Sequence, residues 1–272
     1  MDYNFSEILK QKIKEYYVKY YRDDCSISRF DQLAETRVTE EVLETKRLKY
    51  LRDHMDIDLN NKSVCIVGAG TGGLAVVLYK QYHAVVYGVE PYEPGLNIIK
   101  QKCEEMGMNP DNFLSNSAEV LPFEDDQFDV VYCYTVLEHV QNIEKAIDEM
   151  IRVSKFGGVI YINTPNYSLP YERHYKILFP TFLPKWVGYL YLILLGKSPV
   201  FLQTINYVTE KSINKILAGK KGISWLRLYT PIKQNVKGKT AKVLLFFQRY
   251  FSFYSHQDIL IRKINNKKNT NR

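Results

Sequence analysis

The chain has 272 residues, enough for one sizeable core with an elaboration or a small second domain. Hydrophobic residues make up 46% and charged residues 25%, which is typical of a folded globular protein and excludes a disordered chain. The longest apolar run covers residues 186–195, too short to cross a bilayer, and the opening residues are polar and charged. We therefore expect neither a transmembrane segment nor a signal peptide.

The formal net charge of +7 is divided unevenly along the chain. Residues 1–174 contain 19 Lys/Arg and 28 Asp/Glu, whereas residues 175–272 contain 18 and 2. The two parts therefore face different electrostatic environments. The four cysteines are scattered without a CxxC pair, so we expect reduced thiols in a cytoplasmic protein.

The first predicted element is a helix over residues 5–21, since apolar or aromatic side chains recur there with helical spacing. A second helix is expected over about 39–53. Together they predict an N-terminal helical cap covering residues 1–60.

From residue 61 to residue 166 the pattern alternates between strands and helices. Strands are expected near 63–67, 84–90, 112–118, 128–134 and 159–166, and helices near 72–82, 95–107 and 143–158. Strands that alternate with helices predict an α/β core with a mostly parallel sheet and helices on both faces. A late strand is expected over residues 258–264.

The glycines after the first strand fit two templates. Gly68-x-Gly70-x-x-Gly73 is a dinucleotide fingerprint, whereas Gly68-x-Gly70-x-Gly72 is similar to the first motif of S-adenosylmethionine (SAM) methyltransferases. Glu90, which ends the second strand, is placed to accept hydrogen bonds from ribose hydroxyls in either case. The loop and the acid therefore predict a nucleoside-type ligand and leave its identity open.

Three later features favour the methyltransferase template. "AEVLPF" starts at Ala118, "FDVV" starts at Phe128, and "LEH" ends at His139. This order resembles the class I SAM-dependent methyltransferases over about residues 45–166, which implies a Rossmann-like, mostly parallel seven-stranded sheet with a helical, basic C-terminal elaboration. One departure is Ile66, where that family usually has an acid that organises the loop, so that contact must come from elsewhere or be missing.

The resemblance implies a set of cofactor-binding residues. The methionine and ribose side would be lined by Gly68, Ala69, Gly70 and Gly72. The ribose and the adenine would be held by Glu90, Pro91, Tyr92, Ser117, Ala118 and Glu119. Tyr134 and Thr135 end the fourth strand, at the sheet edge where such folds hold ligands.

Methyl transfer to a weak nucleophile such as a hydroxyl gains from a base. We expect His174 to be that base, oriented by Glu172, although both residues could instead anchor the elaboration. His139 is expected to pack near the cofactor, with a role as base as the alternative. No ligand spacing predicts a metal. No Asn/Asp-Pro-Pro-Tyr motif follows the fourth strand, so an oxygen acceptor is favoured.

Residues 167–265 are expected to form an acceptor lid and the remaining strands, and residues 266–272 a disordered basic tail. The aromatic segment 174–209 loosely resembles an insertion in bacterial methyltransferases of surface-polysaccharide and glycan assembly. It implies O-methylation of a sugar or glycan, lipid-linked in one version. Residues 186–195 and their flanking lysines would then lie on an anionic membrane, at its inner face. The alternative places this helix against the sheet or in a dimer interface.

Other functions stay open at this point. The chain could methylate RNA or another small molecule, bind NAD or FAD as an oxidoreductase, or bind SAM without catalysis. Its cations are dispersed among Leu and Ile and no RNA-binding module is recognisable, which argues against nucleic acid. The expected cofactor is SAM, the expected partner is a small-molecule or glycan acceptor, and a homo-oligomer is not excluded.

Overall fold

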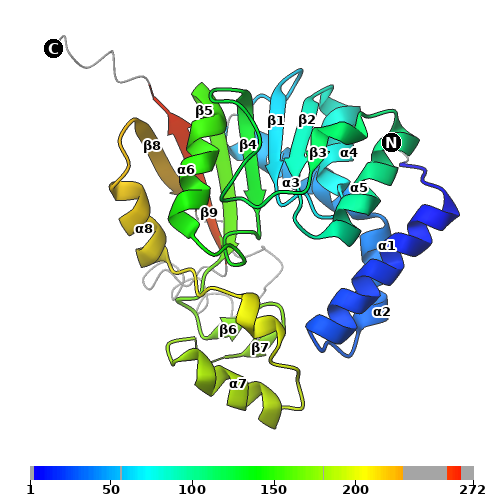
Figure 1. The fold of residues 1–272 in the computed structure, drawn as a ribbon, viewed down its shortest axis with the longest axis vertical. Helices are drawn as coiled ribbons and strands as arrows, with labels where there is room; N and C mark the ends of the chain where they lie inside the picture. The colour runs from blue at the N-terminus through cyan, green and yellow to red at the C-terminus, as the bar shows by residue number, and fades with distance from the viewer. Residues whose placement is uncertain (1–2, 56, 180, 229–255, 265–272) are drawn as a thin grey trace, which may run out of the picture.

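A computed structural model describes residues 3–55, 57–179, 181–228 and 256–264. Its central sheet has seven strands in the order β3-β2-β1-β4-β5-β9-β8 (Figure 1). Their bounds are Ser63–Val67 (β1), Val85–Val89 (β2), Phe113–Leu114 (β3), Phe128–Tyr134 (β4), Ser154–Pro165 (β5), Ile223–Leu228 (β8) and His256–Lys263 (β9). The predicted disordered tail, residues 266–272, lies outside the described residues.

The first five strands run parallel, and β9 enters antiparallel between β5 and β8. The predicted mostly parallel sheet is therefore confirmed. The strand order reverses between β1 and β4, which lie side by side although β2 and β3 come between them in sequence. In open α/β sheets, ligands bind beyond the carboxyl ends of the strands at such a reversal.

Helices cover both faces of the sheet, and each face has its own core. Successive strand residues point to opposite faces, so Val64 and Ile66 join one core while Cys65 and Val67 join the other. The first core includes side chains of α1 (Glu7–Lys19), α3 (Glu40–Met55), α4 (Gly73–Tyr82) and α5 (Glu93–Met106). The second includes side chains of α6 (Ile143–Val153) and α8 (Glu210–Ala218).

The N-terminal helices are integrated into the first core. Phe5, Leu9 and Ile13 of the α1 region are buried in it together with Leu48 of α3. Helix α1 continues as a π-helical turn over Tyr20–Asp24, and a short helix α2 (Phe30–Val38), which the sequence did not predict, precedes α3. The cap therefore brings side chains from residues 3–53 into the core on one face of the sheet.

The predicted helix over 143–158 is wrong at its end. Helix α6 stops at Val153, and β5 begins at Ser154, ahead of the expected position 159. Ser154 is already extended and pairs with Phe128, after which the register shifts. Gly158 permits this path, because an added Cβ would meet the backbone oxygens of Lys155 and Asp129 at 2.8 and 3.2 Å. The glycines thus shape a strand irregularity rather than a helix stop.

Residues 167–207 form a small unit with its own core. It contains the strands β6 (Tyr171–Glu172) and β7 (Ile177–Leu178), helix α7 (Lys185–Leu194) and a 3-10 turn, Phe201–Thr204. Tyr167, Tyr175, Phe179, Leu192, Leu202 and Ile205 pack together inside it. We call this unit the β6–α7 module, and Figure 1 shows it projecting below the sheet. Within the described ranges, no helix is both long and apolar enough to cross a membrane.

Candidate active site

The loop after β1 is held close to the end of β2. The backbone N–H groups of Gly68 and Ala69 both donate to the carbonyl oxygen of Val89 at 2.9 Å. Gly68 has a φ of +70°, and a Cβ added there would overlap the side chain of Val136, which follows β4. Glycine is therefore needed at this position for both the backbone conformation and the close approach.

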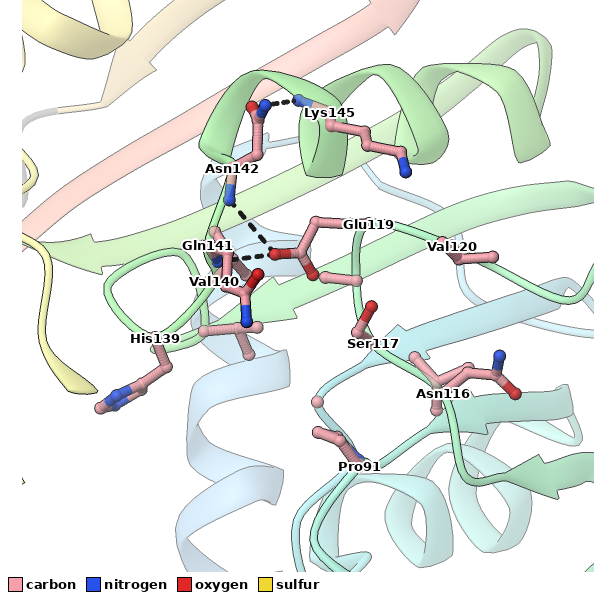
Figure 2. A pocket seen from close by; sticks show the side chains of 14 residues that line it. Pro91, Asn116, Ser117, Glu119, Val120, His139, Val140, Gln141, Asn142 and Lys145 are labelled. Atoms are coloured by element: carbon pink, nitrogen blue, oxygen red, sulfur yellow. Dashed lines mark hydrogen bonds between the residues drawn. The ribbon is translucent and has the colours of Figure 1, made fainter.

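A cavity of about 530 Å³ opens beside this loop, at the carboxyl edge of the sheet. Its volume is in the range of pockets that hold small ligands and cofactors. Figure 2 shows its walls converging from the ends of several strands and the start of α6. The lining residues include Gly68, Val89, Pro91, Asn116, Ser117, Ala118, Glu119, Val136, His139 and Asn142.

Gly68→Ala is expected to weaken nucleoside binding at this cavity. The new Cβ would strain the left-handed backbone by about 1–2 kcal/mol and would displace Val136 in the cavity wall. We expect the dissociation constant for SAM, measured by calorimetry, to rise by at least about tenfold.

Gly157→Ala is the matched control, since Gly157 has a similar φ of +78° with nothing within 4 Å of an added Cβ. Both variants are expected to suffer the strain of a left-handed alanine, but only Gly68→Ala also displaces Val136 and should lose affinity. Equal affinity in the two variants would remove Gly68 from the binding site.

Glu90 organises the backbone at the end of β2. Its carboxylate accepts hydrogen bonds from the N–H of Gly70 at 2.8 Å and from the N–H of Tyr92 at 2.9 Å. The side chain is buried, and burial raises its pKa despite these two bonds. Each oxygen keeps a second lone pair for a ligand hydroxyl. Its neighbours Val89 and Pro91 line the cavity, so the predicted ribose role stays consistent in position.

Ser117, Ala118 and Glu119 form the wall where the adenine was predicted. All three line the cavity (Figure 2). The Glu119 carboxylate accepts backbone hydrogen bonds from Gln141 at 2.6 Å and Asn142 at 3.2 Å. Glu119 therefore joins the two loops of the cavity wall, a role that the sequence did not suggest.

The remaining predicted cofactor residues lie around the cavity but do not line it. Gly70 donates its N–H to Glu90, and Gly72 caps α4 with a φ of +85°, where an added Cβ would overlap Ile99. Tyr92 lies against Tyr16 with ring centroids 5.9 Å apart. For these residues and for Ala69, a direct contact with the cofactor stays a prediction.

Tyr134 and Thr135 also lie outside the cavity lining, and Tyr134 contacts the N-terminal cap. The Arg47 guanidinium lies over the Tyr134 ring, 3.7 Å from its centroid, and Thr135 has a φ of +54°. Arg47 is bound in turn to Glu44, with N–O distances of 2.6 and 2.7 Å. This group forms a polar wall at the end of β4, next to the predicted acceptor side.

Glu40, at the start of α3, supplies the carboxylate that Ile66 does not. It accepts hydrogen bonds from the N–H of Gly73 at 3.0 Å and from the Thr71 hydroxyl at 2.6 Å. The Tyr17 hydroxyl donates to its other oxygen at 3.0 Å. A carboxylate at the N-terminus of α4 also interacts favourably with the helix dipole. The contact that the sequence left unassigned therefore comes from the N-terminal cap.

A buried lysine completes this contact. Lys102 of α5 is fully buried and lies 2.8 Å from a Glu40 oxygen and 2.6 Å from a Glu41 oxygen. Burial would raise the pKa of Glu40, but Lys102 and Arg37 hold it at about 2. The glycine loop, α3 and α5 thus share one charged network. In the sequence, the only sign of this network was the acidic pair Glu40 and Glu41 at the start of the predicted second helix.

Glu172 and His174 form the predicted pair. His174 Nδ1 lies 2.8 Å from a Glu172 oxygen, and Glu172 is fully buried. Tyr167 donates to the same oxygen at 2.9 Å, and the Tyr175 N–H donates to the other at 2.7 Å. Burial would raise the pKa of Glu172, but the hydrogen bond to His174 and those from Tyr175 and Tyr167 keep it below the usual value. An ionised Glu172 fixes the Nδ1–H tautomer, which leaves Nε2 as a proton acceptor.

His139 lies between this pair and the cavity. Its side chain lines the cavity, and its ring centroid is 5.2 Å from that of His174. Phe201 packs against both rings. Potential ligand atoms of Glu138, His139 and His174 lie within 4.8 Å of one another, a grouping that the sequence did not predict. The structure therefore places His139 in the cavity lining and His174 behind His139, outside that lining.

Glu138 gives the stability a specific pH dependence. It is fully buried; one oxygen accepts from Thr164 at 3.0 Å, and the other has no hydrogen-bond partner among the described residues. Burial raises its pKa to about 7. Between pH 4.5 and 7 the unfolded chain therefore loses this proton while the folded chain keeps it, so the contribution of Glu138 to stability falls as pH rises.

Glu138→Gln is expected to remove that dependence. Below pH 4.5 the two proteins should differ little. Across the window the variant should gain about 3 kcal/mol relative to the wild type, with no further change above pH 7. Urea unfolding at a series of pH values measures the difference, and a difference that falls as pH rises would contradict the raised pKa.

The strand order is that of the Rossmann-like fold of class I methyltransferases. The cavity lies where this strand order reverses. Residues 66–162 match the family described as a methyltransferase domain. The chain is 32% identical over 120 residues to a ubiquinone biosynthesis O-methyltransferase of Coxiella burnetii, covering 44% of this chain and 50% of that protein. It is 30% identical over 139 residues to a sterol 4-C-methyltransferase of Caenorhabditis elegans, covering 48% and 41%.

A solved structure shares the fold over most of the chain. It is a geranyl diphosphate C-methyltransferase of Streptomyces coelicolor in complex with Mg²⁺, geranyl diphosphate and S-adenosyl-L-homocysteine. The TM-score is 0.53 at 15% identity, covering 95% of this chain and 98% of that one. The similarity in sequence covers a shorter stretch than the similarity in fold. The chain spans about half the length of the curated relatives it matches.

Proposed function

We propose that this chain is a SAM-dependent methyltransferase that methylates a hydroxyl group. The observation that carries the proposal is the cavity beside Gly68, because it lies within the segment that matches the methyltransferase domain. Gly68 packs directly against Val136, and both residues line the cavity, so glycine at this position keeps the cavity wall in shape.

The chain's own residues divide the work of holding the cofactor. Glu90 would accept hydrogen bonds from the ribose hydroxyls, while Ser117 and Ala118 would border the adenine. Glu40 would keep the start of α4 in place from behind the loop. When bound, SAM supplies a methyl group on a positively charged sulfur, which a nucleophile can attack directly.

His174 would remove the acceptor proton. Its Nε2 accepts the proton from the hydroxyl, and Glu172 stabilises the resulting imidazolium through Nδ1. SAM, held by Glu90 and the wall of Ser117 and Ala118, would supply the methyl group, and the proton released by the acceptor would reside on His174 Nε2. Positioning of the acceptor by the β6–α7 module and the Arg47–Tyr134 wall would supply the in-line geometry.

A sugar or glycan hydroxyl is our proposed acceptor, with a lipid-linked form included. The polar wall around Tyr134 suits a hydroxyl-rich ligand, and a weakly acidic alcohol needs the base that the Glu172–His174 pair provides. The relative named for ubiquinone biosynthesis is an O-methyltransferase, and the sterol enzyme is a C-methyltransferase. Phenols are therefore the second acceptor class to test.

Calorimetry with SAM, S-adenosylhomocysteine, NAD and FAD tests the cofactor. We expect the first two to bind and the last two not to bind. Methyl transfer from labelled SAM to methyl glycosides, catechols and short RNA then tests the acceptor. Binding of NAD or FAD without SAM would overturn the whole proposal, while transfer to RNA alone would overturn the choice of acceptor.

A further inference from the structure

Helix α7 presents an apolar face to solvent. Trp186, Leu190, Ile193 and Leu194 follow one another at helical spacing, and their exposed fractions are 62%, 53%, 58% and 84%. Phe182 and Leu178, just before the helix, are 79% and 72% exposed. A soluble surface rarely exposes so many large apolar side chains together, and such a patch marks an interaction site.

The opposite face of α7 is already used. Gly188 and Leu192 are buried, and Gly188 packs so closely that a Cβ would meet Phe179 and Leu202. Helix α7 therefore already buries one face in the protein core, and the exposed apolar side chains belong to its other face. It points away from the small core of the β6–α7 module.

The charges around this face favour an anionic partner. Lys185 is the first residue of α7 and Lys197 follows the helix, while residues 175–209 contain no Asp or Glu. A second copy docking through the same surface would bring these cations together without a carboxylate to pair with them. A bilayer with anionic headgroups complements both the cations and the apolar side chains.

We propose that the exposed face of α7 docks the protein on an anionic lipid bilayer. The helix has ten residues, which suits a segment lying in the interface with its apolar side chains inserted. Trp186 near one end is typical of the interfacial region, and Lys185 and Lys197 flank the helix. We call the exposed side chains of Leu178, Phe182, Trp186, Leu190, Ile193 and Leu194 the docking surface.

Docking would bring the candidate active site to the membrane. Tyr175 and Phe179 belong to the same small core as Leu192 of α7, and His174 directly precedes Tyr175. The Tyr175 hydroxyl also donates to the carbonyl oxygen of Ser198, just beyond the helix, at 2.7 Å. The bilayer contact and the candidate base are thus parts of one packed unit, so an acceptor carried by a lipid would arrive beside it.

Vesicle sedimentation tests the proposal without cofactor or acceptor, so its outcome is independent of the proposed activity. The wild type should sediment with phosphatidylcholine vesicles that contain phosphatidylglycerol, and less so as salt is raised. Leu190→Glu should lower the bound fraction by about tenfold. Val85→Glu is the matched control: Val85 is 52% exposed at the start of β2, and its variant should bind as the wild type does.

Tryptophan fluorescence reports which helix enters the lipid. The chain has two tryptophans, and Trp225 lies on β8. In a Trp225→Phe protein, emission should shift to the blue on adding these vesicles, whereas a Trp186→Phe protein should show no shift.

Absence of vesicle binding, or equal binding by Leu190→Glu, would overturn the proposal. Equal binding to vesicles of pure phosphatidylcholine would overturn the claim that the lipid partner is anionic. A dimer that forms without lipid and that Leu190→Glu dissociates would assign the surface to a second copy of the chain.

Discussion

Replacing His174 by alanine is expected to lower kcat by about 100- to 10,000-fold, the usual contribution of a general base. The physical reason is the loss of Nε2, which the Glu172 carboxylate holds in its proton-accepting form. The rate is measured as S-adenosylhomocysteine released with the probe acceptor that turns over best. Added imidazole should restore part of the activity, a result that a purely structural role would not produce.

Three comparisons sharpen this test. His83→Asn, at an exposed histidine beyond α4, should leave kcat unchanged. His139→Ala should raise the dissociation constant for SAM more than it lowers kcat, because His139 lines the cavity. A chelator should leave the rate unchanged; if it abolished the rate and a divalent metal restored it, Glu138, His139 and His174 would be ligands and His174 would not be the base.

Replacing Glu40 by alanine is expected to lower the free energy of unfolding by about 3 kcal/mol, as is usual when a buried ion pair loses one partner. The change leaves Lys102 buried with Glu41 as its remaining carboxylate and removes the acceptor of the Gly73 N–H. We also expect weaker SAM binding, because the start of α4 and the Thr71 hydroxyl lose their anchor. Urea unfolding and calorimetry measure the two effects.

The pH dependence distinguishes Glu40 from an ordinary surface acid. Its pKa of about 2 lies below the unfolded value of 4.5, so its contribution is complete above pH 4.5 and is lost as pH falls towards 2. Glu40→Gln should therefore flatten the acid limb of the stability curve. Glu7→Ala, which breaks the exposed pair with Lys10, should cost less than about 1 kcal/mol. An equal effect in both variants would rule out the buried network.

Much of the candidate site could be predicted because its signals are local. Gly68 and Glu90 follow directly from adjacent strands, and parallel strands bring their carboxyl ends to one edge. The residues of the adenine wall, Ser117 to Glu119, also line the cavity as expected. By contrast, Tyr134 and Thr135 were assigned from their position at a strand end; the structure leaves both outside the cavity lining and packs Tyr134 against Arg47 of the N-terminal cap.

The sequence by itself determined the order of strands and helices from residue 61 to residue 166, the nucleoside-type loop and the division of charge. These features follow from the periodicity and spacing of residue types, which are patterns among residues close together in the chain. Only the tertiary structure decided that Glu40 replaces the acid missing at Ile66, that β9 inserts between β5 and β8, and that His139 meets His174. It also decided which face of α7 stays exposed. Each depends on packing between segments far apart in the chain, where periodicity shows that a side chain is apolar or charged but not what it will contact.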